Sequence, residues 1–240
     1  MNSLPSAFST LLLLSVPFFL SACSTSKNAI PRGKGLLSAD KSPPKGAKTW
    51  AVPGWEVGDR YEFSRGSRIP LHYRVLVVGP EERLLLLEGK KHGEKESVLV
   101  LGPDLSDRGV WEWREGMGKG APEKRYLPSD PAFHWPLWVG KTWSSQFMEI
   151  SKDGVQPIRV IYRCEAREPI RTRAGTFDCL RVRRIARLEI PGRIYLDKVS
   201  LLWYSPKVGW WVRKLEDGIE TELTDYQRQG ERKGEPATEK

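Results

Sequence analysis

The sequence contains few of the residues that usually carry chemistry. Only three cysteines and three histidines occur among its 240 residues. His72, His92 and His134 have no i, i+4 spacing and no neighbouring cluster of cysteines or carboxylates, so the pattern predicts no metal site. No Gly-x-Ser-x-Gly motif occurs, and no paired carboxylates lie on an apolar stretch. We therefore predict no catalytic residue and no cofactor, with a hydrolase of unrecognised site as the alternative.

The N-terminal segment lacks charge and lacks a long apolar run. Its first 26 residues contain no charged side chain. The apolar run from Thr10 to Leu20 is shorter than the roughly 20 residues that a membrane-spanning helix needs. It fits the apolar core of about 7–15 residues that a secretory signal contains. The small residues Ser21 and Ala22 follow, as expected before a cleavage site.

The stretch Leu20-Ser21-Ala22-Cys23 resembles the lipobox of bacterial lipoproteins. This resemblance implies cleavage before Cys23 and acylation of its thiol, palmitate being one such chain, so residues 1–22 would be a signal peptide. It also implies a membrane anchor in the cell envelope. Ser24 resembles the sorting signal for an outer membrane, facing the periplasm, rather than for an inner membrane. The alternative is an ordinary cleaved signal peptide with a chance cysteine.

Composition divides the remaining chain into three parts. Residues 23–48 contain several lysines, prolines and glycines and little apolar material, which predicts a flexible tether after the lipidated cysteine. Residues 49–228 are expected to form the globular domain, and residues 229–240 a disordered tail. The net charge of +9 would suggest nucleic acid in a cytosolic protein. For an exported chain we expect anionic envelope lipids or polymers instead, or a solvated basic face without a partner.

The globular part reads as a series of short strands. No amphipathic helix of three turns is evident, and β-like runs are separated by Gly, Pro and Asp. This pattern predicts an all-β fold, an antiparallel curved sheet or partial barrel. Val57-Gly58-Asp59-Arg60-Tyr61 is echoed by Val139-Gly140-Lys141-Thr142-Trp143. The echo indicates either two similar sheet units, divided near residue 130, or a recurrent way of beginning a strand.

Three stretches of the second half form a recognisable pattern: residues 136–143 (PLWVGKTW), 173–182 (RAGTFDCLRV) and 203–209 (WYSPKVG). With these stretches, the second half resembles exported β-rich bacterial proteins of uncharacterised function. The resemblance implies a strand-rich fold and an envelope location. It implies no catalytic residues.

Cys164 and Cys179 remain after Cys23 is assigned to lipid. Each lies in a predicted strand, with a turn between them, and an exported protein meets conditions that permit disulfides. A disulfide between them is one hypothesis. Two buried thiols that act as small apolar residues are the other.

The run from Thr176 to Ile190 alternates clearly. Arg181, Arg183 and Arg187 share one face, and the apolar residues share the other, with Arg184 as the one charge on the apolar face. Three like charges so close need compensation. Glu165 and Glu168 on the preceding run are the expected partners, and an anionic surface is the alternative.

Tryptophan is abundant, with ten residues. Most should belong to the core, but some could line a groove that binds a lipid chain or stacks on sugar rings. The candidates for that groove are Trp111, Trp113, Trp203 and Trp210. Two functions therefore stay open: an anchored envelope protein that acts by binding or scaffolding, and a carrier of a lipid or glycan.

Overall fold

The computed structural model describes residues 32–66, 69–88, 96–188 and 196–230. All of them belong to one compact unit, Pro31–Lys240. The expected signal peptide, Cys23 and the tail from residue 231 lie outside the described residues. Within the described ranges, no helix has the length and apolar character needed to cross a membrane.

The regular structure consists of strands, which confirms the all-β prediction. The strands are β1 (Gly35–Ala39), β2 (Arg60–Arg65), β3 (Ile69–Val78), β4 (Arg83–Leu87), β5 (Glu96–Leu101), β6 (Asp107–Arg114), β7 (Gly118–Asp130), β8 (Thr142–Ser151), β9 (Gly154–Thr172), β10 (Gly175–Leu188), β11 (Leu196–Ser205), β12 (Trp210–Glu216) and β13 (Ile219–Gln227).

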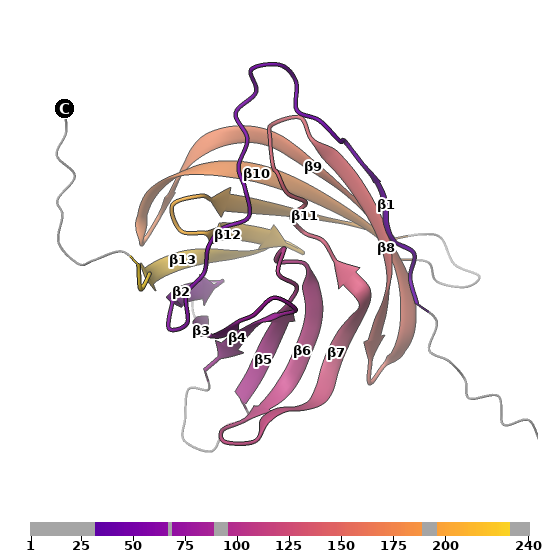
Figure 1. Ribbon diagram of the computed structural model, residues 1–240, viewed down its shortest axis with the longest axis vertical. Helices are drawn as coiled ribbons and strands as arrows, with labels where there is room; N and C mark the ends of the chain where they lie inside the picture. The colour runs from indigo at the N-terminus through magenta and orange to yellow at the C-terminus, as the bar shows by residue number, and fades with distance from the viewer. Residues whose placement is uncertain (1–31, 67–68, 89–95, 189–195, 231–240) are drawn as a thin grey trace, which may run out of the picture. The chain divides into compact units, whose positions relative to one another are not determined.

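Strands β2 to β13 form a closed antiparallel barrel in which each strand pairs with the next along the chain (Figure 1). The barrel closes where β13 pairs with β2, Leu223 lying opposite Phe63. The sequence predicted a curved sheet or partial barrel, and the structure shows full closure. A closed barrel has one inward and one outward face on every strand, which is the reason for the alternation in the sequence.

Strand β1 lies within the segment that we expected to be a flexible tether. It pairs with the first half of β8, where Ala39 lies opposite Trp143. The second half of β8, from Met148 to Ser151, pairs with β7 on the same side. Ser38 and Ser144 also join through their hydroxyl groups, 2.7 Å apart. The boundary at residue 48 is therefore corrected, because the folded unit includes β1. The composition of this segment did not predict β1, because the strand is stabilised by pairing with β8, which lies about 100 residues later in the sequence.

The two echoed motifs begin β2 and β8 with the same backbone pattern. Gly58 N–H donates to Val75 O, and Val75 N–H donates to Asp59 O. Gly140 N–H donates to Cys164 O, and Cys164 N–H donates to Lys141 O. Both glycines have positive φ, 95° and 97°, which a residue without Cβ adopts easily. The repeated motif is thus a repeated turn, and each copy begins one six-strand half of the barrel.

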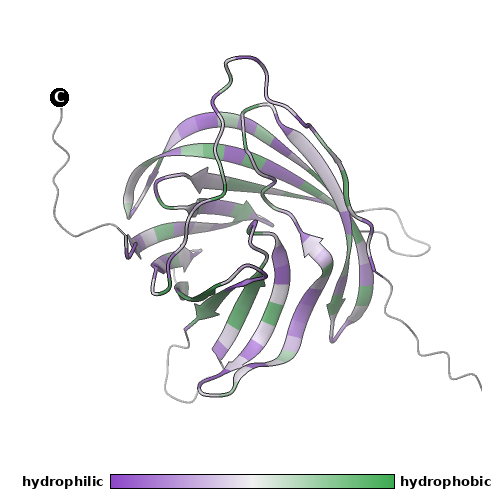
Figure 2. Ribbon diagram, in the orientation of Figure 1, coloured by the Kyte–Doolittle hydropathy of each residue, from purple (hydrophilic) through white to green (hydrophobic). Residues whose placement is uncertain are grey.

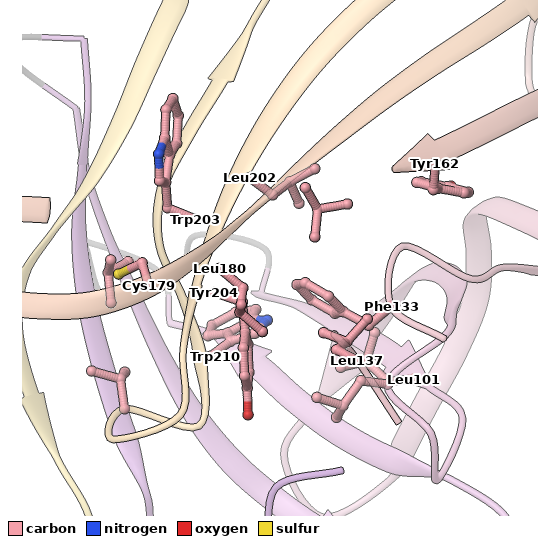
Figure 3. Close-up of a cluster of buried hydrophobic side chains, with 14 of the residues drawn as sticks. Leu101, Phe133, Leu137, Tyr162, Cys179, Leu180, Leu202, Trp203, Tyr204 and Trp210 are labelled. Carbon is pink, nitrogen blue, oxygen red and sulfur yellow. The ribbon is translucent and has the colours of Figure 1, made fainter. Parts of the chain in front are cut away.

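The core fills the barrel and includes the connection between β7 and β8. Figure 2 shows that many strands alternate between hydrophobic and hydrophilic residues. Phe133 and Leu137 from the connection are buried against the barrel wall, and Phe133 lies 5.3 Å from Tyr204 between ring centroids. The Leu101, Phe133 and Leu137 side chains lie close together in Figure 3. Because this connection packs into the core, the chain is not divided into two units near residue 130.

Candidate ligand-binding site in the barrel interior

A cavity of about 150 Å³ lies inside the barrel. Its lining comes from β5, β6, β7, β10, β11 and β12 together with the β5–β6 and β7–β8 connections. The lining residues are Leu99, Leu101, Leu105, Asp107, Tyr126, Asp130, Ala132, Phe133, Arg184, Leu202, Trp210, Trp211, Lys214 and Glu216. Ionisable groups and aromatic rings therefore meet around one partly open space, and convergent polar groups beside aromatic walls are a feature of small-molecule sites.

A second cavity of about 140 Å³ adjoins the first. Trp211, Lys214 and Glu216 line both of them. The second cavity also contacts Arg65 near the end of β2 and Ile219 at the start of β13, and both of these residues are exposed. It therefore leads from the cavity toward the surface at the hairpin ends.

Arg184 and Asp130 form a buried ion pair in the cavity wall. Arg184 Nη2 donates to Asp130 Oδ2 at 2.9 Å, and the Tyr162 hydroxyl donates to Asp130 Oδ1. Arg184 Nε also lies 3.3 Å from the Tyr162 hydroxyl. The Tyr162 ring stacks on Trp143, with 5.2 Å between the ring centroids. Both carboxylate oxygens of Asp130 are thus occupied, and the charge of Arg184 is compensated.

Asp107 lies directly opposite Asp130 in the β6–β7 pairing. Its Oδ1 accepts a hydrogen bond from Gly109 N–H at 2.7 Å. Within the part of the chain that the structure describes, its Oδ2 has no hydrogen-bond partner. Burial, together with the negative charge of Asp130, raises the pKa of Asp107 to about 7. This carboxyl is the one acid of the cavity lining that lacks a basic partner.

Lys214 and Glu216 form the second ion pair of the lining, with Nζ 2.8 Å from Oε2. They are two residues apart on β12 and therefore point to the same face of the strand. Burial opposes the charge of Glu216, but Lys214 and Arg184 nevertheless hold the pKa of Glu216 below its usual value. The pair borders both cavities and so lies on the path between them.

Aromatic rings form much of the remaining wall. The Trp211 ring lies 4.1 Å from Phe63, and the Trp210 ring packs edge-on against Tyr61 and Tyr73, at 5.2 and 5.4 Å between centroids. These contacts fix the two tryptophans in place. Their faces can therefore contact a ligand without a large loss of side-chain freedom.

A larger recess of about 800 Å³ lies over the neighbouring strands β6, β7 and β8, at the end of β8 that leads into the turn to β9. Its lining includes Val110, Glu112, Lys124, Arg125 and Lys152. Lys124 Nζ lies 6.0 Å from the centroid of the Tyr126 ring, which in turn lines the cavity. The recess and the interior cavity share no lining residue.

The four tryptophans that we expected to form a groove do not lie together. Trp210 lines the cavity, whereas Trp111 and Trp113 pack against Leu84, Val98 and Val100, a separate cluster. Trp203 projects away from Tyr204 and Trp210 in Figure 3, and its Nε1–H donates to Glu168. The expected groove is therefore wrong as a single site, since strand alternation cannot show which strands become neighbours in a closed barrel.

Two arginines of the arginine face, Arg181 and Arg183, have the carboxylate partners that the sequence predicted. Arg181 pairs with Glu165 and Glu168, each at 3.2 Å, and Arg183 pairs with Glu165 at 2.6 Å. Arg187 pairs with Asp197 at 2.9 Å. Because each arginine already contacts a carboxylate, the face offers less free positive charge than the sequence alone suggested.

The two remaining cysteines are free, buried thiols, which corrects the disulfide hypothesis. Cys164 lies opposite Val182, whereas Cys179 lies opposite Glu168. The hairpin register thus places the thiols several residues apart along the pair of strands. Burial raises the pKa of each thiol to about 12, so both are protonated at neutral pH.

The sequence alone indicated few residues of the site. It singled out Arg184 as a charge on an apolar face and selected Trp210, but not Asp107, Asp130, Trp211, Lys214 or Glu216. Those residues lie near strand ends, where charged residues are common. Among the described residues, no group of histidines, cysteines or carboxylates has the arrangement of a metal site.

Comparisons with known proteins give likeness in structure only. No protein family and no curated protein matches the sequence. Among solved structures, the chain is similar to a candidate lipoprotein of Parabacteroides distasonis, with 12% identity, 75% of this chain and 100% of that chain covered, and a TM-score of 0.45. It is also similar to the hypothetical lipoprotein YmcC of Escherichia coli, with 8% identity, 74% and 88% covered, and a TM-score of 0.45. A third is a candidate exported protein of Bacteroides fragilis with a YmcC-like fold, with 15% identity, 75% and 100% covered, and a TM-score of 0.41.

Proposed function

We propose that this protein is a lipid-anchored lipoprotein of the cell envelope that binds a small ligand inside its barrel. The cavity beside Asp107 carries this proposal, because it joins an unpaired, partly buried acid to rigid aromatic walls.

The anchor rests on the sequence Leu20-Ser21-Ala22-Cys23. Acyl chains on Cys23, palmitate among them, would hold the barrel at a membrane. In an organism with two membranes, Ser24 favours the outer membrane and the side that faces the periplasm. Two or more acyl chains on one cysteine give stable attachment, whereas a single chain binds only weakly.

The size of the cavity favours a small ligand. About 150 Å³ is below the roughly 300–1,000 Å³ of typical ligand pockets. It is close to the engineered cavity of about 150 Å³ that accepts benzene. A long acyl chain or an oligosaccharide exceeds this space. The interior therefore favours a small-molecule binder over a lipid or glycan carrier.

The contacts of Asp130 favour binding over hydrolysis. Two opposed carboxylates could divide the roles of acid and base, as in many glycosidases. Asp130, however, uses both oxygens, one for Tyr162 and one for Arg184. A carboxylate occupied in this way is poorly placed to attack a substrate or to activate water.

Mass spectrometry of the mature N-terminus tests the anchor. We expect a diacylglyceryl-modified Cys23 and recovery of the protein with membranes. Cys23→Ala should release the protein to the soluble fraction. An unmodified Cys23, or a Cys23→Ala protein that remains with membranes, would contradict the anchor.

Native mass spectrometry of the full chain, purified from cells in mild detergent, tests the interior site. We expect a small adduct that is lost in Trp211→Ala. Trp113→Ala is the matched control, because Trp113 packs outside the cavity lining and its loss should leave the adduct in place. No adduct in the wild-type protein, together with no change in tryptophan fluorescence on adding small polar compounds of either charge, would contradict binding in the barrel.

A further inference from the structure

The charges in the cavity lining do not balance. The lining contains three acidic side chains, Asp107, Asp130 and Glu216, but only two basic ones, Arg184 and Lys214. Asp130 forms an ion pair with Arg184, and Glu216 forms one with Lys214. Asp107 is therefore the acid without a basic partner in the lining. An anion in the cavity would approach an unpaired acid, and a neutral ligand would leave that acid without a partner. A cation would complete the pairing.

The walls near Asp107 also suit a cation with a carbon skeleton. Trp210, Trp211, Tyr126 and Phe133 present aromatic faces or edges to the same space. A positive group over such a ring is attracted by about 0.5–2 kcal/mol, the larger value applying where water is excluded. A bare metal ion is less suited, because one free carboxylate oxygen cannot supply the six to eight ligands that Ca²⁺ prefers.

We propose that the cavity binds a small organic ammonium ion, with its nitrogen against Asp107 Oδ2 and its carbon skeleton against Trp210 and Trp211. This inference rests on the proposed function and specifies the ligand class. The volume of about 150 Å³ restricts the ligand to fewer than about ten non-hydrogen atoms. The cavity lined by Arg65 and Ile219 is the path by which it enters.

Binding of a cation at Asp107 is coupled to a proton. The charged and titratable groups that face Asp107 are Asp130, Lys124 and Tyr126 on β7, Lys214 on β12 and Tyr73 on β3. Asp130 opposes ionisation of Asp107, and the two lysines favour it. Because the free carboxyl has a pKa of about 7, it must lose its proton when the ammonium ion binds. Affinity should therefore rise about tenfold from pH 6 to pH 8.

Isothermal titration of the full chain in mild detergent tests the ligand class. The probes are benzylammonium and butylammonium, with benzyl alcohol and benzoate as neutral and anionic probes of similar size. We expect the two ammonium ions to bind and the alcohol and benzoate to bind at least tenfold more weakly. Asp107→Asn should weaken ammonium binding at least tenfold at pH 8 and abolish its dependence on pH.

Two controls keep the result interpretable. Asp197→Asn removes an exposed carboxylate that is not part of the cavity lining and should leave the affinity unchanged. Trp211→Leu tests the aromatic wall without altering charge and should also weaken ammonium binding. It replaces Asp107→Asn as the test variant if Asp107→Asn fails to fold. Circular dichroism establishes that each variant is folded.

The outcomes separate the inference from the proposed function. Binding of benzyl alcohol or benzoate as tight as that of benzylammonium would overturn the ligand class and leave a binding cavity. Ammonium binding that neither Asp107→Asn nor Trp211→Leu weakens would overturn the assigned site. Failure of every probe to bind, with no adduct in native mass spectrometry, would overturn the proposed function as well.

Discussion

Arg184 and Asp130 are 54 positions apart in the sequence, yet their charged groups meet 2.9 Å apart inside the barrel. They come from β10 and β7, which are not neighbours in the sheet. The pair therefore spans the barrel interior, and the Tyr162 hydroxyl joins it from β9. Such a link constrains how three strands are arranged around the cavity.

Removing one member of this pair should destabilise the fold strongly. Asp130→Ala or Arg184→Met leaves an uncompensated buried charge, which costs about 3–5 kcal/mol. The double variant Asp130→Ala/Arg184→Met should lose much less stability than the two single variants lose in sum, because no unpaired charge remains in it. Urea denaturation measures these changes. Arg187→Met on the same strand, at an exposed pair, is the control and should have little effect; equal losses at the two sites would contradict the assignment.

The Asp107 carboxyl should make stability depend on pH between about 4 and 7. Its pKa is 3.8 as an ordinary group and about 7 in the fold, so only the folded state holds the proton in this window. The contribution of Asp107 to stability is therefore largest below pH 4 and is lost as pH rises toward 7. Asp107→Asn should remove this slope and stabilise the protein at pH 8 by at most about 4 kcal/mol. Thermal unfolding across pH, compared with Asp197→Asn, checks the sign; a wild-type slope unchanged in Asp107→Asn would contradict it.

Lys141 should contribute more to stability than an exposed lysine. Its side chain is 1% exposed, and Nζ donates to His134 O at 2.8 Å and to Pro136 O at 2.7 Å. Lys141→Met leaves both carbonyls without this donor and should cost about 2–4 kcal/mol. Lys119→Met removes the exposed pair with Glu82 and should cost at most about 1 kcal/mol. Similar costs in chemical denaturation would show that Lys141 does not hold the β7–β8 connection.

The two thiols should be inert in the folded protein. Cys164 and Cys179 are buried, and burial raises the pKa of each to about 12. A thiol reagent at pH 8 should therefore label them only at the rate of unfolding. Reducing agent should leave the unfolding temperature unchanged. Rapid labelling without denaturant, or a reductant-dependent unfolding temperature, would contradict the arrangement of free buried thiols.

The arginine face should bind anionic vesicles weakly. Arg181, Arg183 and Arg187 already contact carboxylates. Sedimentation of Cys23→Ala protein with phosphatidylglycerol vesicles at low salt should show little binding. Replacing Glu165 and Glu168 with Gln should increase it, because the arginines then lose their partners. Strong, salt-sensitive binding of the starting protein that Arg181→Gln and Arg183→Gln abolish would show that the face serves a membrane.

The sequence predicted the strand class and the odd position of Arg184, but not the site. Alternation along one strand is a local property, so Arg184 could be recognised as a charge on the inner face. Which acid would meet it depended on barrel closure and on the register of β7, which no local pattern contains. Asp107 and Asp130 are adjacent only because β6 and β7 pair with three bulges between them. The expected Trp groove was wrong for the same reason, since Trp111, Trp113, Trp203 and Trp210 belong to three different surroundings.

The pairing of β1 with β8 shortens the segment that would join the barrel to a membrane anchor at Cys23. For a chain anchored at Cys23, the fold begins at Gly35 rather than after Lys48. A stretch of 35 − 23 = 12 residues reaches at most about 40 Å when fully extended, about half the reach of the tether that composition suggested. In such a chain the start of β1 would stay within that distance of the bilayer surface. A ligand would be collected within a thin layer beside the membrane, and any donor or acceptor protein has to act in that same layer.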